Sequence, residues 1–421
     1  MKILWITNIP LPEASSLINE DSVPFGGWLV NASDALAEKE DINLSIAFPK
    51  KNIVDNLFIQ GEKKSFYAFP EVTEKNINAS NIDLCLKKIL EDTNPDIVHI
   101  FGTEYPHTLA IVNLCESKKI NTVISIQGLM SICSVHYMAY LPERVQNKFT
   151  LRDLIKRDNL KQQRNKFIKR GEFEIKSIKK VEHVIGRTTW DKACVKQINS
   201  DVQYHFCNET LREQFYKHEW DINKCEKYSI FISQGTYPIK GLHIILEALP
   251  IVLTKFPDTK LYVGGHNITK TKSLKDKLKM SSYGKYIKEL IYKNNLADKV
   301  IFTGILNESE MCDRYLNSNV FVCPSSIENS PNSLGEAMIL GVPCISAYVG
   351  GVGDLLNHRR EGFVYQADAH YMLAHYICEI FDNKKMTLEF SKNARLHAMK
   401  THDRQENTDR IIAIYKKIIS N

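Results

Sequence analysis

A repeated order of short apolar runs and helical patterns constrains this chain more than any other feature. The run at 2–7 is almost continuously apolar, as expected for a strand covered on both faces of a sheet. A helical pattern follows at 28–39, and further apolar runs lie at 43–48, 97–101, 122–127 and 181–188. Strands that alternate with helices predict a doubly wound parallel sheet.

The same order begins again in the C-terminal half. Its apolar runs, several of which end in glycine, lie at 228–235, 260–265, 299–304, 320–325 and 342–347. We therefore predict an α/β protein with two facing Rossmann-like domains, which meet near residues 222 and 223. Parallel sheets bind ligands beyond the carboxyl ends of their strands, so the cleft between the domains is the expected site.

Composition excludes several classes of protein. With 421 residues, 43% apolar and 25% charged, the chain is neither disordered nor fibrous. No apolar run reaches the roughly 18 residues of a membrane span, and the first ten residues do not resemble a signal peptide, so we expect a cytoplasmic protein. The ten cysteines are scattered singly without a C-x-x-C pair. This pattern suggests neither a zinc site nor a disulfide framework. Separately, we expect no cofactor and no metal ion.

Positive charge gathers in one segment. Thirteen lysines and arginines but four acids lie between Arg144 and Lys180, within a chain whose net charge is +6. The segment 144–180 also carries scattered apolar residues. It could lie on an anionic membrane surface, which would make the protein peripheral at the inner face of the cell membrane, or it could be a packed helix with a solvated basic face. No aromatic-interleaved groove accompanies the charges, so nucleic acid is not an expected partner.

The strongest candidates for binding and catalysis lie close together at residues 324–353. Glu328 lies in a loop after a strand, and Glu336 lies just inside a helix that begins either at Ser330-Pro331 or at Ser333, where Glu336 would close a capping box. A helix N-terminus at this place suits a phosphate group, and two carboxylates suit sugar hydroxyls. From spacing alone, a capping glutamate and a solvated loop acid explain the same residues equally well.

This stretch resembles the signature of the retaining, nucleotide-sugar-dependent glycosyltransferases of the GT-B fold, family 4, which build bacterial surface polysaccharides. The matching residues are Glu328, Glu336 with Ala337-Met338, the GVP at 341–343, and Gly350-Gly351 with Asp354. The resemblance implies that Glu336 binds the nucleotide ribose, that Glu328 contacts the transferred sugar, and that loop and helix residues of the same stretch approach the diphosphate. The residues near the diphosphate are Asn332, Ser333 and Leu334, and Asn329 and Ser330 are further donor-binding candidates. It also implies that a final helix at 402–421 returns to the first domain, which gives domains of 1–222 with 402–421, and 223–401.

A second match lies at 233–249. The family's arginine and lysine, which clamp the donor diphosphate, correspond to Gln234 and Lys240. A neutral amide can donate to a phosphate oxygen but lacks the charge, so leaving-group stabilisation would fall on Lys240 and on the helix N-terminus. The resemblance therefore makes Glu328 and Lys240 the catalytic candidates.

Weaker matches complete the predicted pocket. On the donor side they are Gly26, Gly27, Gly265, His266 and Leu306. On the acceptor side the candidates are Glu104, His107 and Gln127, the last standing where the family often has histidine. Asn208 and Arg212 could line the cleft, or cap and pair locally.

The implied activity is transfer of a hexose-type sugar from a UDP- or GDP-linked donor to a hydroxyl of a glycan or lipid-linked acceptor, without a metal ion. A sugar-nucleotide epimerase on the same fold is the competing enzyme. A catalytically degenerate paralogue that binds a glycan or a partner is the non-enzyme alternative, which the neutral Gln234 and Gln127 keep open.

Overall fold

The computed structural model describes residues 1–21, 26–73, 81–271, 273 and 278–420. The chain divides into two compact units. The N-terminal unit comprises residues 1–131, 169–211 and 402–421, and the C-terminal unit comprises residues 132–168 and 212–401. This division differs from the predicted domains mainly at residues 132–168. These residues lie in the first half of the sequence but belong to the C-terminal unit. The division falls inside the long helix α8, Leu160–Lys180.

The N-terminal unit is built on an eight-stranded sheet of order β3-β4-β2-β1-β5-β6-β7-β8. Its neighbouring strands are parallel except for β3, which pairs antiparallel with β4 at the edge. The strands are β1 (Lys2–Ile6), β2 (Asn43–Lys50), β3 (Leu57–Gln60), β4 (Ser65–Pro70), β5 (Ile97–Phe101), β6 (Thr122–Ser125), β7 (His183–Gly186) and β8 (Gln203–Phe206). The helices wholly in this unit are α1 (Pro12–Leu17), α2 (Gly27–Ala37), α3 (Ile82–Thr93), α4 (Pro106–Lys118), α9 (Thr189–Ile198) and α19 (Arg404–Ile419).

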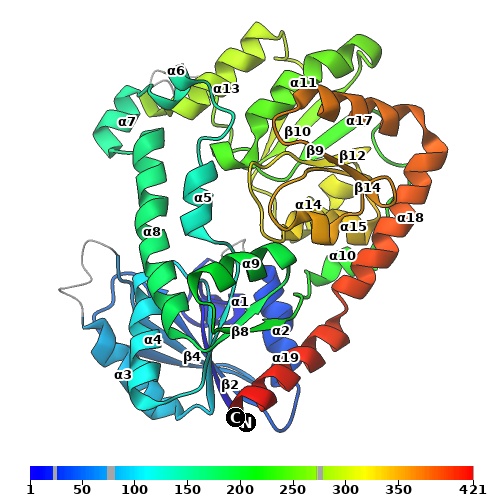
Figure 1. Cartoon of the computed structure of the whole chain (residues 1–421). Helices are drawn as coiled ribbons and strands as arrows, with labels where there is room; N and C mark the ends of the chain where they lie inside the picture. The colour runs from blue at the N-terminus through cyan, green and yellow to red at the C-terminus, as the bar shows by residue number, and fades with distance from the viewer. Residues whose placement is uncertain (22–25, 74–80, 272, 274–277, 421) are drawn as a thin grey trace. The chain divides into compact units, whose positions relative to one another are not determined.

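The last helix, α19, completes the core of the N-terminal unit. It lies beside α2 (Figure 1), and Ile414, Tyr415 and Ile418 pack with residues of β1 and β2. The Tyr415 ring is fully buried, and its hydroxyl lies 3.1 Å from Trp5 Nε1 and 2.5 Å from His99 Nδ1. Residues 402–421 are thus part of the N-terminal unit's folded core.

The C-terminal unit has a six-stranded, fully parallel sheet of order β11-β10-β9-β12-β13-β14. Its strands are β9 (Ser229–Ile232), β10 (Lys260–Gly264), β11 (Val300–Gly304), β12 (Val320–Cys323), β13 (Cys344–Ala347) and β14 (Gly362–Tyr365). Its helices are α6 (Glu143–Gln146), α7 (Leu151–Lys156), α10 (Glu213–Lys217), the 3-10 turn η2 (Pro238–Lys240), α11 (Leu242–Lys255), α13 (Ser282–Lys293), α14 (Glu308–Leu316), α15 (Asn332–Leu340), α16 (Val352–Leu355), α17 (His370–Asp382) and α18 (Lys384–Thr401). Helix α5 (Met130–His136), like α8, is shared between the units.

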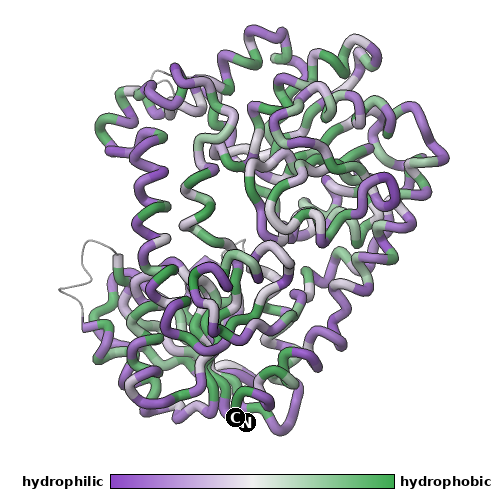
Figure 2. Tube along the Cα trace, in the orientation of Figure 1, coloured by the Kyte–Doolittle hydropathy of each residue, from purple (hydrophilic) through white to green (hydrophobic). Residues whose placement is uncertain are grey.

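Two Rossmann-like units with parallel sheets confirm the predicted fold class. The reason is visible in the hydropathy of the trace, because the strands are mostly hydrophobic while the outer helices alternate between hydrophobic and hydrophilic residues (Figure 2). In the C-terminal sheet β9, β12 and β13 are adjacent, and all four residues of each strand are buried. The loops that leave these three strands therefore emerge side by side at one edge.

Candidate active site

An ion pair between Lys240 and Glu328 lies at that edge of the C-terminal sheet. Lys240 ends the turn η2 after β9, and Glu328 lies in the loop after β12. The Lys240 Nζ and Glu328 Oε1 atoms are 2.5 Å apart, and the side chains are 24% and 13% exposed. The two residues that the sequence resemblance picks out as catalytic are thus brought together from positions 88 apart in sequence.

Two glycines allow the loops around this pair to approach one another. Gly241 adopts a left-handed φ of +69°, and a Cβ atom there would lie 1.8 Å from the Pro324 carbonyl oxygen. Gly350, with φ +51°, is as close to the Glu328 carbonyl oxygen, which also accepts a hydrogen bond from Gly351 N at 3.1 Å. A side chain at either glycine would push the loops apart. These glycines therefore position Lys240 and Glu328.

The charge environment keeps Lys240 protonated. Burial alone would lower the pKa of its ammonium group, but the nearby Glu328 carboxylate outweighs burial and raises that pKa overall. Ser326 in the same loop is fixed by its backbone N–H, which donates to Ile239 O at 2.8 Å, and by its hydroxyl, which donates to the carbonyl of His136 at 3.1 Å. A permanently charged cation on a fixed loop can bind a phosphate group.

The second carboxylate, Glu336, is held by an arginine. Arg212 Nε and one terminal nitrogen donate to the two carboxylate oxygens of Glu336 at 2.7 and 2.9 Å. Glu336 is 7% exposed, and burial raises the pKa of its carboxyl group while Arg212 opposes that shift. The Arg212 guanidinium also lies 4.6 Å from the centre of the Phe215 ring. Arg212 thus pairs with Glu336, 124 positions away, and not with a residue close to it in the sequence.

The start of α15 differs from both predicted starts. The helix begins at Asn332 with Pro331 as the N-cap residue, and no side chain caps it. The predicted capping box between Ser333 and Glu336 is wrong, because the Glu336 carboxylate turns to Arg212 instead of back to the first turn. The helix still places its N-terminal turn directly after the Glu328 loop.

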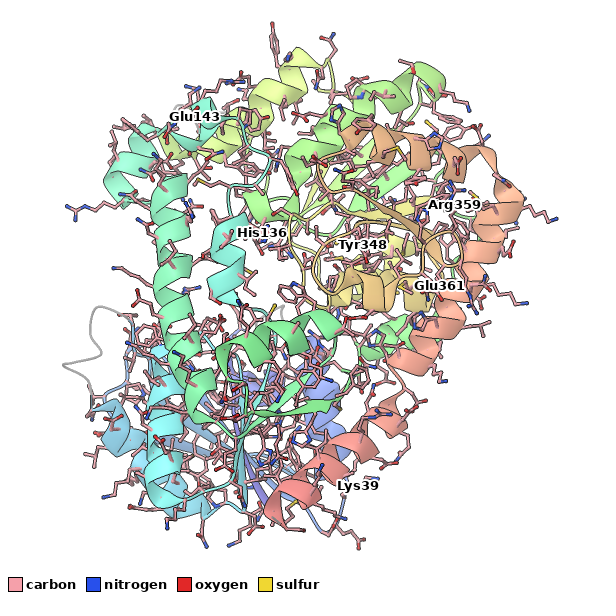
Figure 3. The ribbon with its side chains drawn as sticks, viewed as in Figure 1. Lys39, His136, Glu143, Tyr348, Arg359 and Glu361 are labelled. Carbon is pink, nitrogen blue, oxygen red and sulfur yellow. The ribbon has the colours of Figure 1, made fainter. Side chains whose placement is uncertain are left out.

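The other predicted donor-side residues of the C-terminal unit lie on loops at strand ends. Gln234 follows β9, and its side-chain amide lies 3.5 Å from the Thr236 hydroxyl. Gly265 has a φ of +90°, and His266 next to it is exposed. Leu306 and Ser333 are partly buried, as is Asn332, whereas Asn329, Ser330 and Leu334 are buried. Tyr348, which follows β13, is 66% exposed and is labelled in Figure 3.

The candidates of the N-terminal unit come from different segments of the chain. Gly26 is the left-handed N-cap of α2, which Gly27 begins. His107 is 2% exposed, its Nε2 atom lies 2.9 Å from Asn8 Oδ1, and burial lowers its pKa to about 3. Glu104 is partly buried, and burial raises the pKa of its carboxyl group. Of the acceptor-side candidates, His107 is thus an interior residue of the unit.

Gln127 lies in a pocket that sequence reasoning missed. Glu209 accepts hydrogen bonds from Gln127 Nε2 and from an Arg187 guanidinium nitrogen, both at 2.7 Å. Aromatic side chains of Trp5, Trp28 and Phe101 form another part of the lining. The pocket lies at the carboxyl ends of β1, β5, β6 and β7, where a parallel sheet binds ligands. Arg187 and Glu209 had no recognisable motif around them.

The described part of the chain holds no group of three or more histidine, cysteine, aspartate or glutamate side chains arranged to bind a metal ion. Among the same residues, no helix is both long and apolar enough to cross a membrane.

The C-terminal half of the chain matches the model of one known family. Residues 213–397 match the model of glycosyl transferases group 1, a stretch that contains Lys240, Glu328 and Glu336. This match supports membership of that family. Among curated relatives of this chain, a putative glycosyltransferase, YtcC, from Bacillus subtilis is 26% identical over 198 residues, which cover 46% of each protein. An uncharacterized glycosyltransferase of Methanocaldococcus jannaschii is 28% identical over 137 residues, 32% of this chain and 31% of the relative. The match thus spans less than half the length of these relatives.

Solved structures show that the fold is GT-B. This chain resembles a sucrose-phosphate synthase from Thermosynechococcus elongatus with a TM-score of 0.73 at 14% identity, over 100% of both chains. It also resembles Anabaena HepE in complex with UDP-glucose, with a TM-score of 0.64 at 14% identity, over 99% of this chain and 100% of HepE. At this identity the likeness concerns the fold.

Proposed function

We propose that this chain is a retaining, family 4 glycosyltransferase that moves a hexose from a UDP- or GDP-linked donor to a hydroxyl group of a glycan or lipid-linked acceptor. The observation that carries the proposal is the Lys240–Glu328 pair, held by Gly241 and Gly350 beside the N-terminus of α15. The family match over 213–397 supports it. A neighbour of the same fold, HepE, was crystallised with UDP-glucose, which favours a nucleotide-sugar donor here.

In the proposed reaction the bond between the sugar's anomeric carbon and the diphosphate oxygen breaks. Lys240 and the N-terminal turn of α15 stabilise the negative charge that grows on the departing diphosphate. The carboxylate of Glu328 stabilises the positive charge that develops on the sugar ring. The acceptor oxygen then bonds to the anomeric carbon on the same face, and its proton passes to the departing phosphate oxygen. This step needs no separate base.

The pairing of Glu336 with Arg212 fits the proposed ribose role. An ionised carboxylate has about four acceptor positions, and Arg212 occupies two of them. The remaining positions can accept the two ribose hydroxyls. On this account Arg212 orients Glu336 for the ribose and keeps the buried carboxylate charged.

A thermal-shift screen against UDP, GDP and their sugars tests donor binding, because a ligand that binds the folded chain raises its melting temperature. Release of nucleotide diphosphate, measured with and without a hydroxyl acceptor, then tests transfer. We expect a shift with one nucleotide series and release that depends on the acceptor. Binding without release would favour a degenerate paralogue, and a changed sugar with no released diphosphate would favour an epimerase.

A further inference from the structure

Helix α7 exposes a compact apolar face. Leu151, Leu154 and Ile155 are 53%, 57% and 75% exposed, and Phe149, just before the helix, is 56% exposed. The spacing of the three helical residues places them within about 100° of one face of the helix. We call these four side chains, with the exposed Lys156, Arg157 and Lys161 that follow them, the α7 patch.

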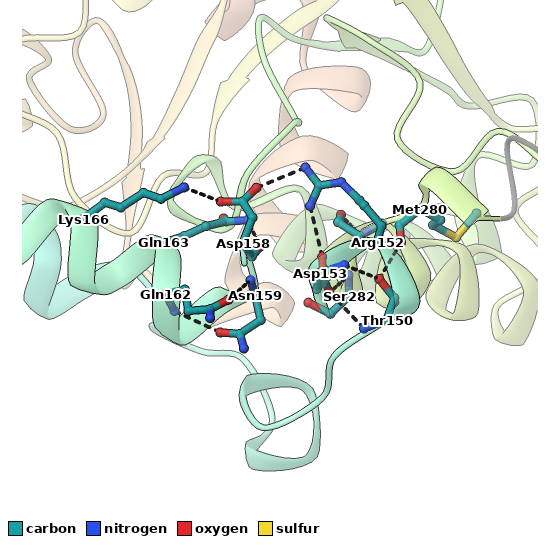
Figure 4. Close-up of polar contacts among 12 residues, drawn as sticks. Thr150, Arg152, Asp153, Asp158, Asn159, Gln162, Gln163, Lys166, Met280 and Ser282 are labelled. Carbon is teal, nitrogen blue, oxygen red and sulfur yellow. Dashed lines mark hydrogen bonds and ion pairs between the residues drawn. The ribbon is translucent and has the colours of Figure 1, made fainter. Parts of the chain in front are cut away.

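The opposite side of α7 is anchored to the C-terminal unit. Thr150 and Asp153 form a capping box, and the Asp153 side chain is fully buried. Asp153 accepts a hydrogen bond from Ser282 N at 2.9 Å, and the Thr150 hydroxyl donates to Met280 O at 2.8 Å (Figure 4). Because Asp153 lies about opposite Leu151, Leu154 and Ile155 on the helix, these bonds hold the apolar face toward solvent.

The cations near α7 divide into paired and unpaired ones. Arg152 and Lys166 both bond to Asp158, at 3.1 and 2.7 Å (Figure 4). Within the described ranges, the side chains of Lys156, Arg157 and Lys161 form no ion pair or hydrogen bond. Positive charge that the chain itself does not neutralise thus adjoins the apolar face.

We propose that the α7 patch docks this chain on a bilayer that contains anionic lipid. Exposed apolar side chains enter the boundary between headgroups and acyl chains, while nearby cations attract the negative headgroups. A second copy of the chain fits less well, because a stable interface needs roughly 20–30 residues on each side, and the patch has far fewer. The inference concerns binding to a surface and does not depend on the proposed reaction.

The structure also limits which part of the basic segment 144–180 can contact a membrane. Residues 169–180 belong to the N-terminal unit and 144–168 to the C-terminal unit, so the segment 144–180 is not one continuous feature of a single unit. Ile178, within the apolar residues of that segment, is fully buried. The membrane contact is therefore assigned to α7 and the residues next to it, and the second half of α8 has no part in it.

Flotation of the full chain with vesicles tests the proposal. The probes are vesicles of phosphatidylcholine with phosphatidylglycerol, and vesicles of phosphatidylcholine alone. We expect the wild-type chain to bind the anionic vesicles at least about tenfold more strongly, since each cation near such a surface strengthens binding about fivefold. The double variant Leu154→Gln, Ile155→Gln keeps every charge and should lower binding to anionic vesicles at least about tenfold.

Two further variants separate charge from apolar contact. Arg157→Gln with Lys161→Gln should remove most of the preference for anionic over neutral vesicles and leave the apolar side chains in place. Leu388→Gln with Leu396→Gln is the matched control, since these residues of α18 are 44% and 63% exposed outside the patch. Its vesicle binding should equal that of the wild-type chain.

Equal vesicle binding by the wild-type chain and the Leu154→Gln, Ile155→Gln variant would overturn the proposal. So would a dimer, seen by light scattering, that this variant dissociates while neither form binds vesicles. Melting temperature and the nucleotide thermal shift should be the same in all variants. A wild-type chain that binds vesicles but no nucleotide would refute the proposed function and leave the docking surface intact.

Discussion

The two sheets each carry a carboxylate paired with a cation at the carboxyl ends of their strands, but the two pairs differ in burial. In the C-terminal unit the Lys240 side chain is 24% exposed, and Glu328 meets it from a neighbouring loop. In the N-terminal unit the Arg187 side chain is only 5% exposed, and Glu209 accepts from Gln127 as well. The two acids are similarly buried, at 13% and 11% exposed, so the difference lies in the cations. Lys240 is open enough to exchange its partner for a ligand, whereas Arg187 is part of the interior.

This difference teaches that an ion pair at a sheet edge is not by itself a reactive site. A partly exposed pair can trade its partner for a phosphate or a sugar at little cost in folding free energy. A buried pair that loses one member leaves an uncompensated charge, which destabilises the fold. Substitutions at the two acids should therefore have opposite consequences for activity and stability.

The largest expected effect is on catalysis. Glu328→Gln should lower the rate of sugar transfer about a thousandfold, because a positioned charge that acts on the transition state typically contributes that much. Because Lys240 keeps 24% exposure, the free energy of unfolding should fall by about 1 kcal/mol or less. The measurement is nucleotide diphosphate release together with urea denaturation. Transfer at the wild-type rate would remove Glu328 from the reaction.

The matching substitution in the N-terminal unit should act on stability. Glu209→Gln leaves Arg187 buried without its carboxylate and should lower the free energy of unfolding by about 2–3 kcal/mol. Urea denaturation measures this loss. If Glu209→Gln unfolds at the wild-type urea concentration, the contrast between the two pairs is wrong.

The cation of the C-terminal pair should matter for binding. Lys240→Ala should weaken the affinity for nucleotide diphosphate about 10- to 30-fold, as expected when one hydrogen bond to a charged group is lost. Isothermal calorimetry measures this change. Lys255→Ala, in the same unit but on the exposed end of α11 beside Asp382, is the control and should bind like the wild-type chain. Unchanged affinity in Lys240→Ala would place the phosphates elsewhere.

The smallest expected effect is on the pH dependence of stability. Burial lowers the pKa values of His99 and His107 to about 3. Unfolding restores them to about 6.5, so the unfolded chain binds more protons and stability falls as the pH drops through this range. Between pH 7 and pH 6 each histidine should cost about 0.7 kcal/mol. His107→Asn should reduce the measured drop in unfolding free energy by that amount, and an unchanged drop would contradict the assignment.

Much of the fold could be predicted because runs of apolar residues indicate buried parallel strands. The predicted runs correspond to β1, β2, β5, β6 and β7 in the first sheet and to β9 through β13 in the second. The sequence did not reveal β3, β4, β8 and β14. Three of these, β3, β8 and β14, are edge strands, and the fourth edge strand, β11, was predicted. An edge strand such as β3, with one of its four residues buried, has too little apolar pattern to be recognised.

The site divides in the same way. Lys240 and Glu328 could be named because motif residues surround them, and Gly241 and Gly350 have a backbone role that only glycine fills. The Arg212–Glu336 pair could not be predicted, because the two residues are 124 positions apart and no local pattern links them. The sequence also could not predict that 132–168 belong to the C-terminal unit, because the continuous helix α8 crosses the boundary between the units.

A crystal of the full chain soaked with nucleotide diphosphate tests the central claim most directly. The account predicts a diphosphate oxygen within about 3 Å of Lys240 Nζ and density beside the first turn of α15. Nucleotide bound instead at Gln127 and Glu209, with the Lys240–Glu328 pair unchanged and α15 bare, would contradict it.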